Sequence, residues 1–439
     1  MRFFYLMLKI TLPYTTRIYY PRQKLVNSPK EFFGRTIYVS NHAASFMDPF
    51  IAAGLRRPLV FFMTRSDVFT PISKPILWAS HMLPIYREHD GEDTKNKNEE
   101  VFKKCARILS FGRNLLIFGE GFTDDVFIRR LKPIKKGAVR IGFTTLEEIN
   151  WSKKIYIAAV GCNYSDPNEM RSDVLISTSE KICLNDYKND FLENPNKVIN
   201  DLTKEIELRL IAQLTHVENA EMAPFHENVM KITRKGMNAT CSDHSISLEK
   251  RWKYSQKLAR WFNENVNEQN EPLMNLKKEL ESYFGLQKKL HLDERYVYEL
   301  KTRNGSRFKE LLFMLTMWPF AILGFIHCAI PYVLCKRFVE KTFRRRVFWS
   351  SVKLLTAKIS MGLLNIPFIF LFYKFIYPSY LLGFVYYGCI GLFGLAAYMW
   401  IRNLRSFQIK GKMKAMDIDK IWAKRIELVK KINELIPVS

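Results

Sequence analysis

A histidine and an aspartate lie six positions apart in a short polar stretch, Asn41-His42-Ala43-Ala44-Ser45-Phe46-Met47-Asp48-Pro49. Histidine is a common general base near neutral pH, and a carboxylate beside it fixes its tautomer and stabilises its protonated form. A regular helix cannot make this contact, because six steps of about 100° turn the two side chains far apart. We therefore expect a loop contact, with Asp48 at or near a helix start. On these residues alone, a loop histidine followed by a helix N-cap is the simpler interpretation.

Three later stretches carry groups that suit a phosphorylated substrate. Residues 83–87 (LPIYR) predict a strand end that delivers the Arg87 guanidinium, whose fork of donors fits a phosphate. Residues 115–121 (LLIFGEG) predict an apolar strand that ends in Glu120 between two glycines, where the backbone can approach a ligand closely. Residues 130–140 (RLKPIKKGAVR) place basic side chains at and before an expected helix N-terminus, and a helix N-terminus favours anion binding. Taken singly, the first two stretches also have structural explanations: a surface ion pair for Arg87 and a turn for the glycines around Glu120.

A fourth stretch, residues 155–161 (IYIAAVG), predicts an apolar strand that lines an acyl groove or fills the core. In order and spacing the four stretches resemble the sequence blocks of the glycerolipid acyltransferase family, the glycerol-3-phosphate and lysophosphatidic acid acyltransferases. The resemblance covers about residues 30–185. Residues 83–101 and 130–142 resemble a large membrane-bound bacterial branch of that family.

The resemblance implies a role for each motif. His42 would deprotonate an acceptor hydroxyl, which then attacks the thioester carbonyl of acyl-CoA or an acyl carrier protein, and Asp48 would orient His42. The residues implied to hold the glycerol phosphate acceptor are Arg87, Glu120, Gly121, Lys132 and Lys136. This chemistry requires neither a metal nor a cofactor, only the acyl donor as co-substrate.

The sequence departs from the family pattern at several positions. Five residues separate His42 from Asp48 where the family has four, Gly119 replaces a proline, and Ala159 replaces the proline of the fourth block. Thr123 stands where many members have arginine, which shifts the expected phosphate contacts towards Arg87 and the lysines. The acceptor therefore remains open between glycerol-3-phosphate, lysophosphatidic acid and another lysophospholipid.

The elements around these motifs alternate between strands and helices. Such alternation predicts an α/β domain over residues 31–187, with a mostly parallel sheet flanked by helices. The expected strands are 35–40, 59–63, 82–87, 114–118, 154–161 and 173–177, and the expected helices are 49–55, 75–81, 99–111 and 136–147. Residues 188–305 show apolar positions three and four apart and predict a helical extension. Residues 1–30 mix aromatic and basic side chains, which favours an interfacial helix on a bilayer.

The C-terminal part contains long apolar runs and predicts a membrane region over residues 306–402. Residues 311–335 carry no charged side chain, and further spans are expected near 354–373 and 378–401. Pro319 and Pro331 favour a re-entrant or interfacial path for the first run, although a span is the alternative. If the first run is re-entrant or interfacial and the next two runs form a two-span hairpin, the basic residues 336–346 and the basic tail 403–439 lie on the same side of the membrane.

The overall charge is strongly basic, with 68 Lys and Arg against 43 Asp and Glu in 439 residues. An excess of this size favours an anionic partner, and the apolar runs select a lipid bilayer over nucleic acid. The seven cysteines are scattered singly, which argues against a zinc site or a disulfide framework. We expect an integral protein of the bacterial inner membrane with its catalytic domain on the cytoplasmic face.

Two alternatives from other classes stay open at this point. A catalytically silent lipid-binding membrane protein would share the basic charge and the apolar runs, and it would be insensitive to loss of His42. A nucleic-acid-binding protein would also use the charge, but no recognised nucleic-acid module is present in the sequence. Oligomeric state is not indicated.

Overall fold

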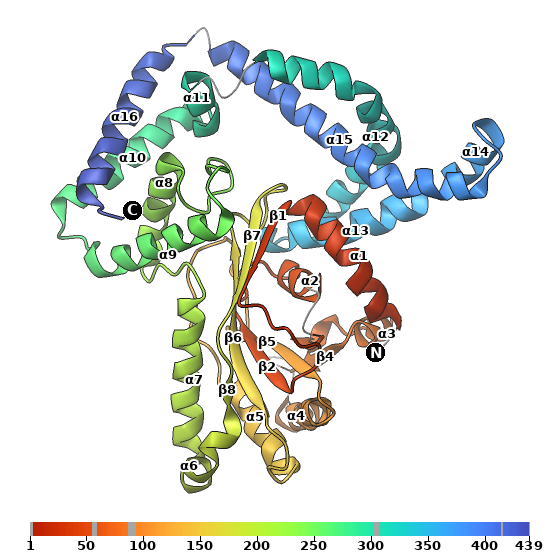
Figure 1. Cartoon of the computed structure of the whole chain (residues 1–439), viewed down its shortest axis with the longest axis vertical. Coiled ribbons are helices and arrows are strands. Elements are labelled where there is room, and N and C mark those ends of the chain that lie inside the picture. Colours follow the sequence, from red (N-terminus) through yellow and green to blue (C-terminus); the bar gives the residue numbers. More distant parts are fainter. Residues whose placement is uncertain (1–2, 55–58, 87–93, 303–306, 414–415, 439) are drawn as a thin grey trace. The chain divides into compact units, whose positions relative to one another are not determined.

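The structure is a computed structural model that describes residues 3–54, 59–86, 94–302, 307–413 and 416–438 (Figure 1). The chain divides into two compact units. The first comprises Met1–Ala223 and His244–Asn265, and the second comprises Pro224–Asp243 and Val266–Ser439.

The first unit is built on an eight-stranded sheet in the order β1-β7-β6-β2-β5-β3-β4, with β8 also paired to β6. The strands are β1 (Arg22–Val26), β2 (Thr36–Ser40), β3 (Val60–Arg65), β4 (Met82–Ile85), β5 (Asn114–Phe118), β6 (Tyr156–Tyr164), β7 (Asp173–Thr178) and β8 (Ile182–Cys183). The central strands β6, β2, β5, β3 and β4 run parallel, whereas β7 and β8 are antiparallel to β6. All five residues of β2 are buried, as expected for a parallel strand covered on both faces.

Helices cover this sheet and enclose its core (Figure 1). They are α1 (Phe3–Tyr19), α2 (Met47–Gly54), α3 (Ser73–Ala79), α4 (Thr94–Ser110), α5 (Gly137–Glu148), α6 (Lys188–Glu193), α7 (Pro195–Ala212) and α9 (Leu248–Asn265). One buried cluster joins apolar side chains of α4, α5 and α7 to those of β2 and β5. The predicted fold class, a mostly parallel sheet flanked by helices with a helical and apolar C-terminal part, is confirmed.

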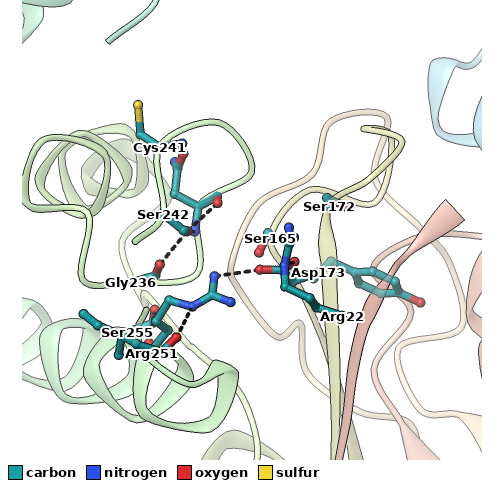
Figure 2. Close-up of polar contacts among 12 residues, drawn as sticks. Arg22, Ser165, Ser172, Asp173, Gly236, Cys241, Ser242, Arg251 and Ser255 are labelled. Carbon is teal, nitrogen blue, oxygen red and sulfur yellow. Dashed lines mark hydrogen bonds and ion pairs between the residues drawn. The ribbon is translucent and has the colours of Figure 1, made fainter. Parts of the chain in front are cut away.

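A buried ion pair anchors α9 beside the β1–β7 edge of the sheet. Asp173, the first residue of β7, accepts from the Arg251 guanidinium at 2.6 Å, and both side chains are almost completely buried (Figure 2). The second oxygen of Asp173 pairs with Arg22 on β1. Strand β1 is not predicted by sequence pattern, because its residues RQKLV lack the apolar run of the central strands.

The second unit is entirely helical in its described part. It contains α8 (Ala223–Thr233), α10 (Glu271–Lys289), α11 (Glu294–Lys301), α12 (Arg307–Thr342), α13 (Trp349–Leu364), α14 (Pro367–Phe375), α15 (Tyr380–Met413) and α16 (Ile418–Leu435). By length and composition, three segments could cross a membrane: Arg307–Thr342, Arg346–Phe375 and Tyr380–Met413. The first of these is one continuous helix of 36 residues that includes both Pro319 and Pro331.

Helices α12 and α15 pair along their length in antiparallel fashion (Figure 1). Near one end, Glu310 of α12 accepts from Ser406 and Lys410 of α15. Further along, Gly324 of α12 lies directly against the backbone of Phe393. Small residues at such a crossing let two apolar helices approach closely.

Candidate active site

The parallel pairing of β2 and β5 brings two of the predicted motifs together. Ser40 and Phe118, the last residues of the two strands, lie opposite each other in the sheet. The Gly119 N–H donates to the Ser40 carbonyl at 2.9 Å and extends this pairing by one step. His42 and Glu120 therefore leave the sheet side by side, at the carboxyl edge where ligands of α/β folds bind.

A loop joins His42 to Asp48. Asp48 lies in the first turn of α2, and Ser45 adopts the left-handed conformation (φ 51°) that turns the intervening loop. The Asp48 Oδ2 atom lies 2.9 Å from His42 Nδ1 and accepts the Ala44 N–H at 2.9 Å. One carboxylate oxygen therefore both closes the loop and contacts the imidazole, which leaves His42 Nε2 as the ring nitrogen for a substrate.

His42 is held from two further directions. Its ring stacks on Phe118 with 4.3 Å between centroids and 19° between planes, and its N–H donates to Glu120 Oε1 at 2.7 Å. The side chain of His42 is 21% exposed, whereas that of Asp48 is completely buried. The imidazole is thus fixed in orientation and still open on one side.

Glu120 links the two strand ends to the basic segment that follows. Its Oε2 atom accepts the Lys132 N–H at 3.3 Å. Burial raises the pKa of Glu120, and the N–H groups of His42 and Lys132 partly oppose that shift by stabilising the carboxylate. Gly121 follows with φ 76°, a conformation that favours glycine.

A polar pocket of about 500 Å³, including its open mouth, lies over His42 and Glu120. Its other lining residues include Asp124, Arg130 and Lys132 from the segment after β5, and Tyr164 from β6. Lys132 pairs with Asp124 at 2.7 Å and lies over the Phe122 ring, whereas Arg130 is exposed. The pocket therefore places cationic side chains beside the histidine.

Two described residues that the sequence predicts for the site, Gly121 and Lys136, do not line the pocket. Lys136 is exposed immediately before α5 and does not line the described part of the pocket. Arg87 lies outside the described residues. Strand β4, which ends at Ile85, is separated from β2 by β3 and β5, and Tyr86 exchanges two hydrogen bonds with Asn98.

Three residues that sequence reasoning missed support the pair formed by His42 and Asp48, which we call the dyad. The Tyr164 hydroxyl donates to Asp48 Oδ1 at 2.8 Å. Asn41 exchanges two hydrogen bonds with the backbone of Cys162, and Arg129 donates to the carbonyls of Tyr164 and Ser165. The strand expected at residues 154–161 stops three residues before Tyr164, whereas β6 continues to Tyr164, so the length of this strand is the signal that could have found it.

Cys162 lines the pocket, but its thiol is not activated as a nucleophile. Burial raises the pKa of the Cys162 thiol to about 12, so this thiol stays protonated at neutral pH. Within the described ranges there is no cluster of three or more His, Cys, Asp or Glu side chains placed to hold a metal ion.

Comparison with known proteins finds similarities for the sheet region. Residues 23–163 match the family model described as Acyltransferase. No curated protein sequence matches the chain. Among solved structures, the chain is similar to the 1-acyl-sn-glycerophosphate (LPA) acyltransferase PlsC from Thermotoga maritima, with 13% identity and a TM-score of 0.30 over 47% of this chain and 80% of that chain.

Proposed function

Because residues 23–163 match the family model described as Acyltransferase, we propose that this protein transfers a fatty acyl group from an acyl thioester to glycerol-3-phosphate or lysophosphatidic acid in phospholipid biosynthesis. The observation that carries the proposal is the His42–Asp48 pair, 2.9 Å apart at the edge of a pocket lined by cationic side chains. The thioester would be acyl-CoA or an acyl carrier protein.

His42 is the proposed general base. Its Nε2 atom takes the proton of the acceptor hydroxyl as the oxygen attacks the thioester carbonyl carbon, and Asp48 stabilises the resulting imidazolium. When the tetrahedral intermediate collapses, the carbon–sulfur bond breaks and His42 returns the proton to the thiolate. The products are an ester and a free thiol, and no acyl-enzyme forms. Holding both reactants in one pocket lowers the barrier by converting a bimolecular step into an effectively unimolecular one.

The acceptor phosphate is proposed to bind the basic groups around the pocket. Lys132 and the exposed Arg130 lie on its wall, and Glu120 fixes the backbone of Lys132. Arg87 lies outside the described residues. It is proposed as a further phosphate contact because the fork of donors on its guanidinium fits a phosphate. Gly121 lets the backbone pass close to the acceptor, and Lys136 contributes positive potential from the start of α5.

A bilayer is the proposed site of action. Helix α1 exposes a stripe of apolar side chains at helical spacing, namely Phe3, Leu6, Met7, Ile10 and Tyr14. The antiparallel contact of Glu310 with Lys410 puts the entry to α12 and the exit from α15 at the same end of the pair. If both helices span, the residues before α12 and the tail after α15 share one face, which we propose is the cytoplasmic face of the bacterial inner membrane.

The test is an acyl transfer assay on the purified protein in detergent. Labelled acyl-CoA is offered with glycerol-3-phosphate, lysophosphatidic acid or another lysophospholipid, and ester formation is followed. We expect transfer to a phosphate-bearing acceptor, loss of the chemical step in His42→Ala, and a raised KM for the acceptor in Arg87→Ala.

His291→Asn is the matched control, because His291 is exposed and lies outside the pocket. It also has a positive φ of 53°, which asparagine tolerates. Turnover of His42→Ala at the parent rate would refute the assignment of the base. Absence of transfer to every acceptor in the parent would favour a silent lipid-binding protein.

A further inference from the structure

We propose that Tyr164 is a positioning residue that holds the Asp48 carboxylate in the orientation His42 needs. This inference rests on the proposed function of His42 as the base. It concerns a residue at the end of β6 that follows the last position matched by the acyltransferase model, residue 163.

The two carboxylate oxygens of Asp48 have different hydrogen-bond partners. Oδ2 faces His42 Nδ1 and the Ala44 N–H, whereas Oδ1 accepts the Tyr164 hydroxyl at 2.8 Å. Asp48 and Tyr164 are both completely buried. Rotation of the carboxylate about its Cβ–Cγ bond would break the contacts of both oxygens together, so the Tyr164 hydrogen bond fixes the direction in which Oδ2 faces the ring.

Tyr164 is itself held firmly. Arg129 donates to its carbonyl at 2.7 Å and to the next carbonyl, that of Ser165, at 2.9 Å. Tyr164 also lies opposite Val174 in the β6–β7 pairing, and its ring lies 5.7 Å from that of Tyr20. The hydroxyl is therefore presented by a rigid strand and not by a mobile loop.

The Tyr164 hydroxyl is protonated, as a hydrogen-bond donor to Asp48 must be. Burial, together with the nearby Asp48 charge, raises the pKa of Tyr164 well above its ordinary value, so the hydroxyl keeps its proton and remains a donor across the working pH range. Burial also raises the pKa of three groups around His42 and Asp48, namely Glu120, Cys162 and Tyr20. The other charged side chains that line the pocket beside His42 are Asp124, Arg129, Arg130 and Lys132.

Loss of this donor has two distinct consequences. A less constrained carboxylate orients His42 less well, which lowers kcat without touching the acceptor, so KM is unchanged. The carboxylate also loses a hydrogen bond that stabilised its negative charge, so the dyad takes up a proton more readily. The acidic limb of the kcat/KM profile must then move to higher pH.

The experiment compares Tyr164→Phe with Tyr20→Phe in the full-length protein. Tyr20 is an equally buried tyrosine in ring contact with Tyr164, but its hydroxyl donates to the Pro167 carbonyl and not to Asp48. Three quantities are measured: kcat and KM for the acceptor, the pH profile, and the pH dependence of His42 modification by diethyl pyrocarbonate, followed by peptide mass spectrometry. The third does not require acyl transfer.

We expect kcat of Tyr164→Phe to fall about tenfold with KM unchanged, and both pH profiles to move up by about 0.5 to 1 unit. Tyr20→Phe should keep parent values. Equal behaviour of the two variants would overturn the proposal, as would a change confined to KM. If the parent transfers no acyl group but the modification profile still moves only in Tyr164→Phe, the positioning role stands and the proposed function fails.

Discussion

Replacement of Asp48 by asparagine tests how much the buried charge contributes to the proposed chemistry. An asparagine can keep its carbonyl oxygen towards His42 and Ala44 while its amide donates to the Tyr164 hydroxyl, so the loop and the tautomer of His42 survive. What disappears is the negative charge. At the observed 2.9 Å and an effective dielectric constant of about 20, a full charge pair is worth roughly 6 kcal/mol.

Solvent reduces this figure, because 21% of the His42 side chain is exposed. We therefore expect Asp48→Asn to raise the barrier by about 3–4 kcal/mol, which lowers kcat by roughly 10²–10³-fold. The assay is the initial rate of acyl transfer at saturating acceptor over a range of pH. Without the carboxylate the imidazole takes up a proton less readily, so the acidic limb should move to lower pH, opposite to the shift expected for Tyr164→Phe.

The control for this variant is Asp190→Asn, an exposed aspartate on α6 that lies outside the pocket. A kcat of Asp48→Asn within about twofold of the parent would refute the electrostatic reasoning, since that corresponds to less than roughly 0.5 kcal/mol. A large loss of kcat with an unmoved acidic limb would show that Asp48 acts only as the cap of its loop.

Two further predictions concern stability. The pKa of Glu120 is higher in the folded protein than its ordinary value of 4.5. Glu120 therefore contributes most to the free energy of unfolding below pH 4.5, and this contribution is lost as the pH rises through the pKa of the folded state. The melting temperature of the parent relative to Glu120→Gln should therefore fall between pH 4.5 and neutrality, and a constant difference would contradict the shift. In α12, an added Cβ at Gly324 would clash with the Phe393 carbonyl oxygen, so Gly324→Ala should destabilise by about 1–3 kcal/mol. Gly391→Ala, where a Cβ meets nothing within 4 Å, should be neutral or stabilising by up to about 1 kcal/mol. Equal melting temperatures of these two variants in detergent would contradict the close α12–α15 contact.

Local signals were enough to predict most of the sheet and the loop geometry. The apolar run that predicts a strand at residues 114–118 coincides with β5, because the first three residues of this strand are buried, the last two are half-buried, and a short apolar run of this kind is typical of a core strand. The six-residue offset between His42 and Asp48 excluded a shared helix face, and in the structure a loop with Asp48 in the first turn of α2 joins them.

Contacts between distant strands could not be predicted in this way. Tyr164 and Asp48 are separated by 116 residues, and Asn41 and Cys162 by 121, so neither pair is visible before the order of the strands is known. The reversed direction of β7 was hidden for a related reason, since a buried strand has the same composition whether it runs parallel or antiparallel. Edge strand β1 was missed because its exposed, charged residues resemble a loop.

The position of β2 in the sheet has a consequence for how the protein is made. Its two neighbours, β5 and β6, begin at Asn114 and Tyr156. Strand β2, which leads into His42, therefore leaves the ribosome long before either neighbour has been synthesised. Until then both of its edges are open, which is the state most prone to mispairing in the nascent chain. The histidine and aspartate are close in sequence, but the hydrogen bond between Tyr164 and Asp48 spans 116 residues and can form only after Tyr164 is synthesised. A chain that has not yet reached Tyr164 therefore contains His42 and Asp48 without the hydrogen bond that holds the Asp48 carboxylate.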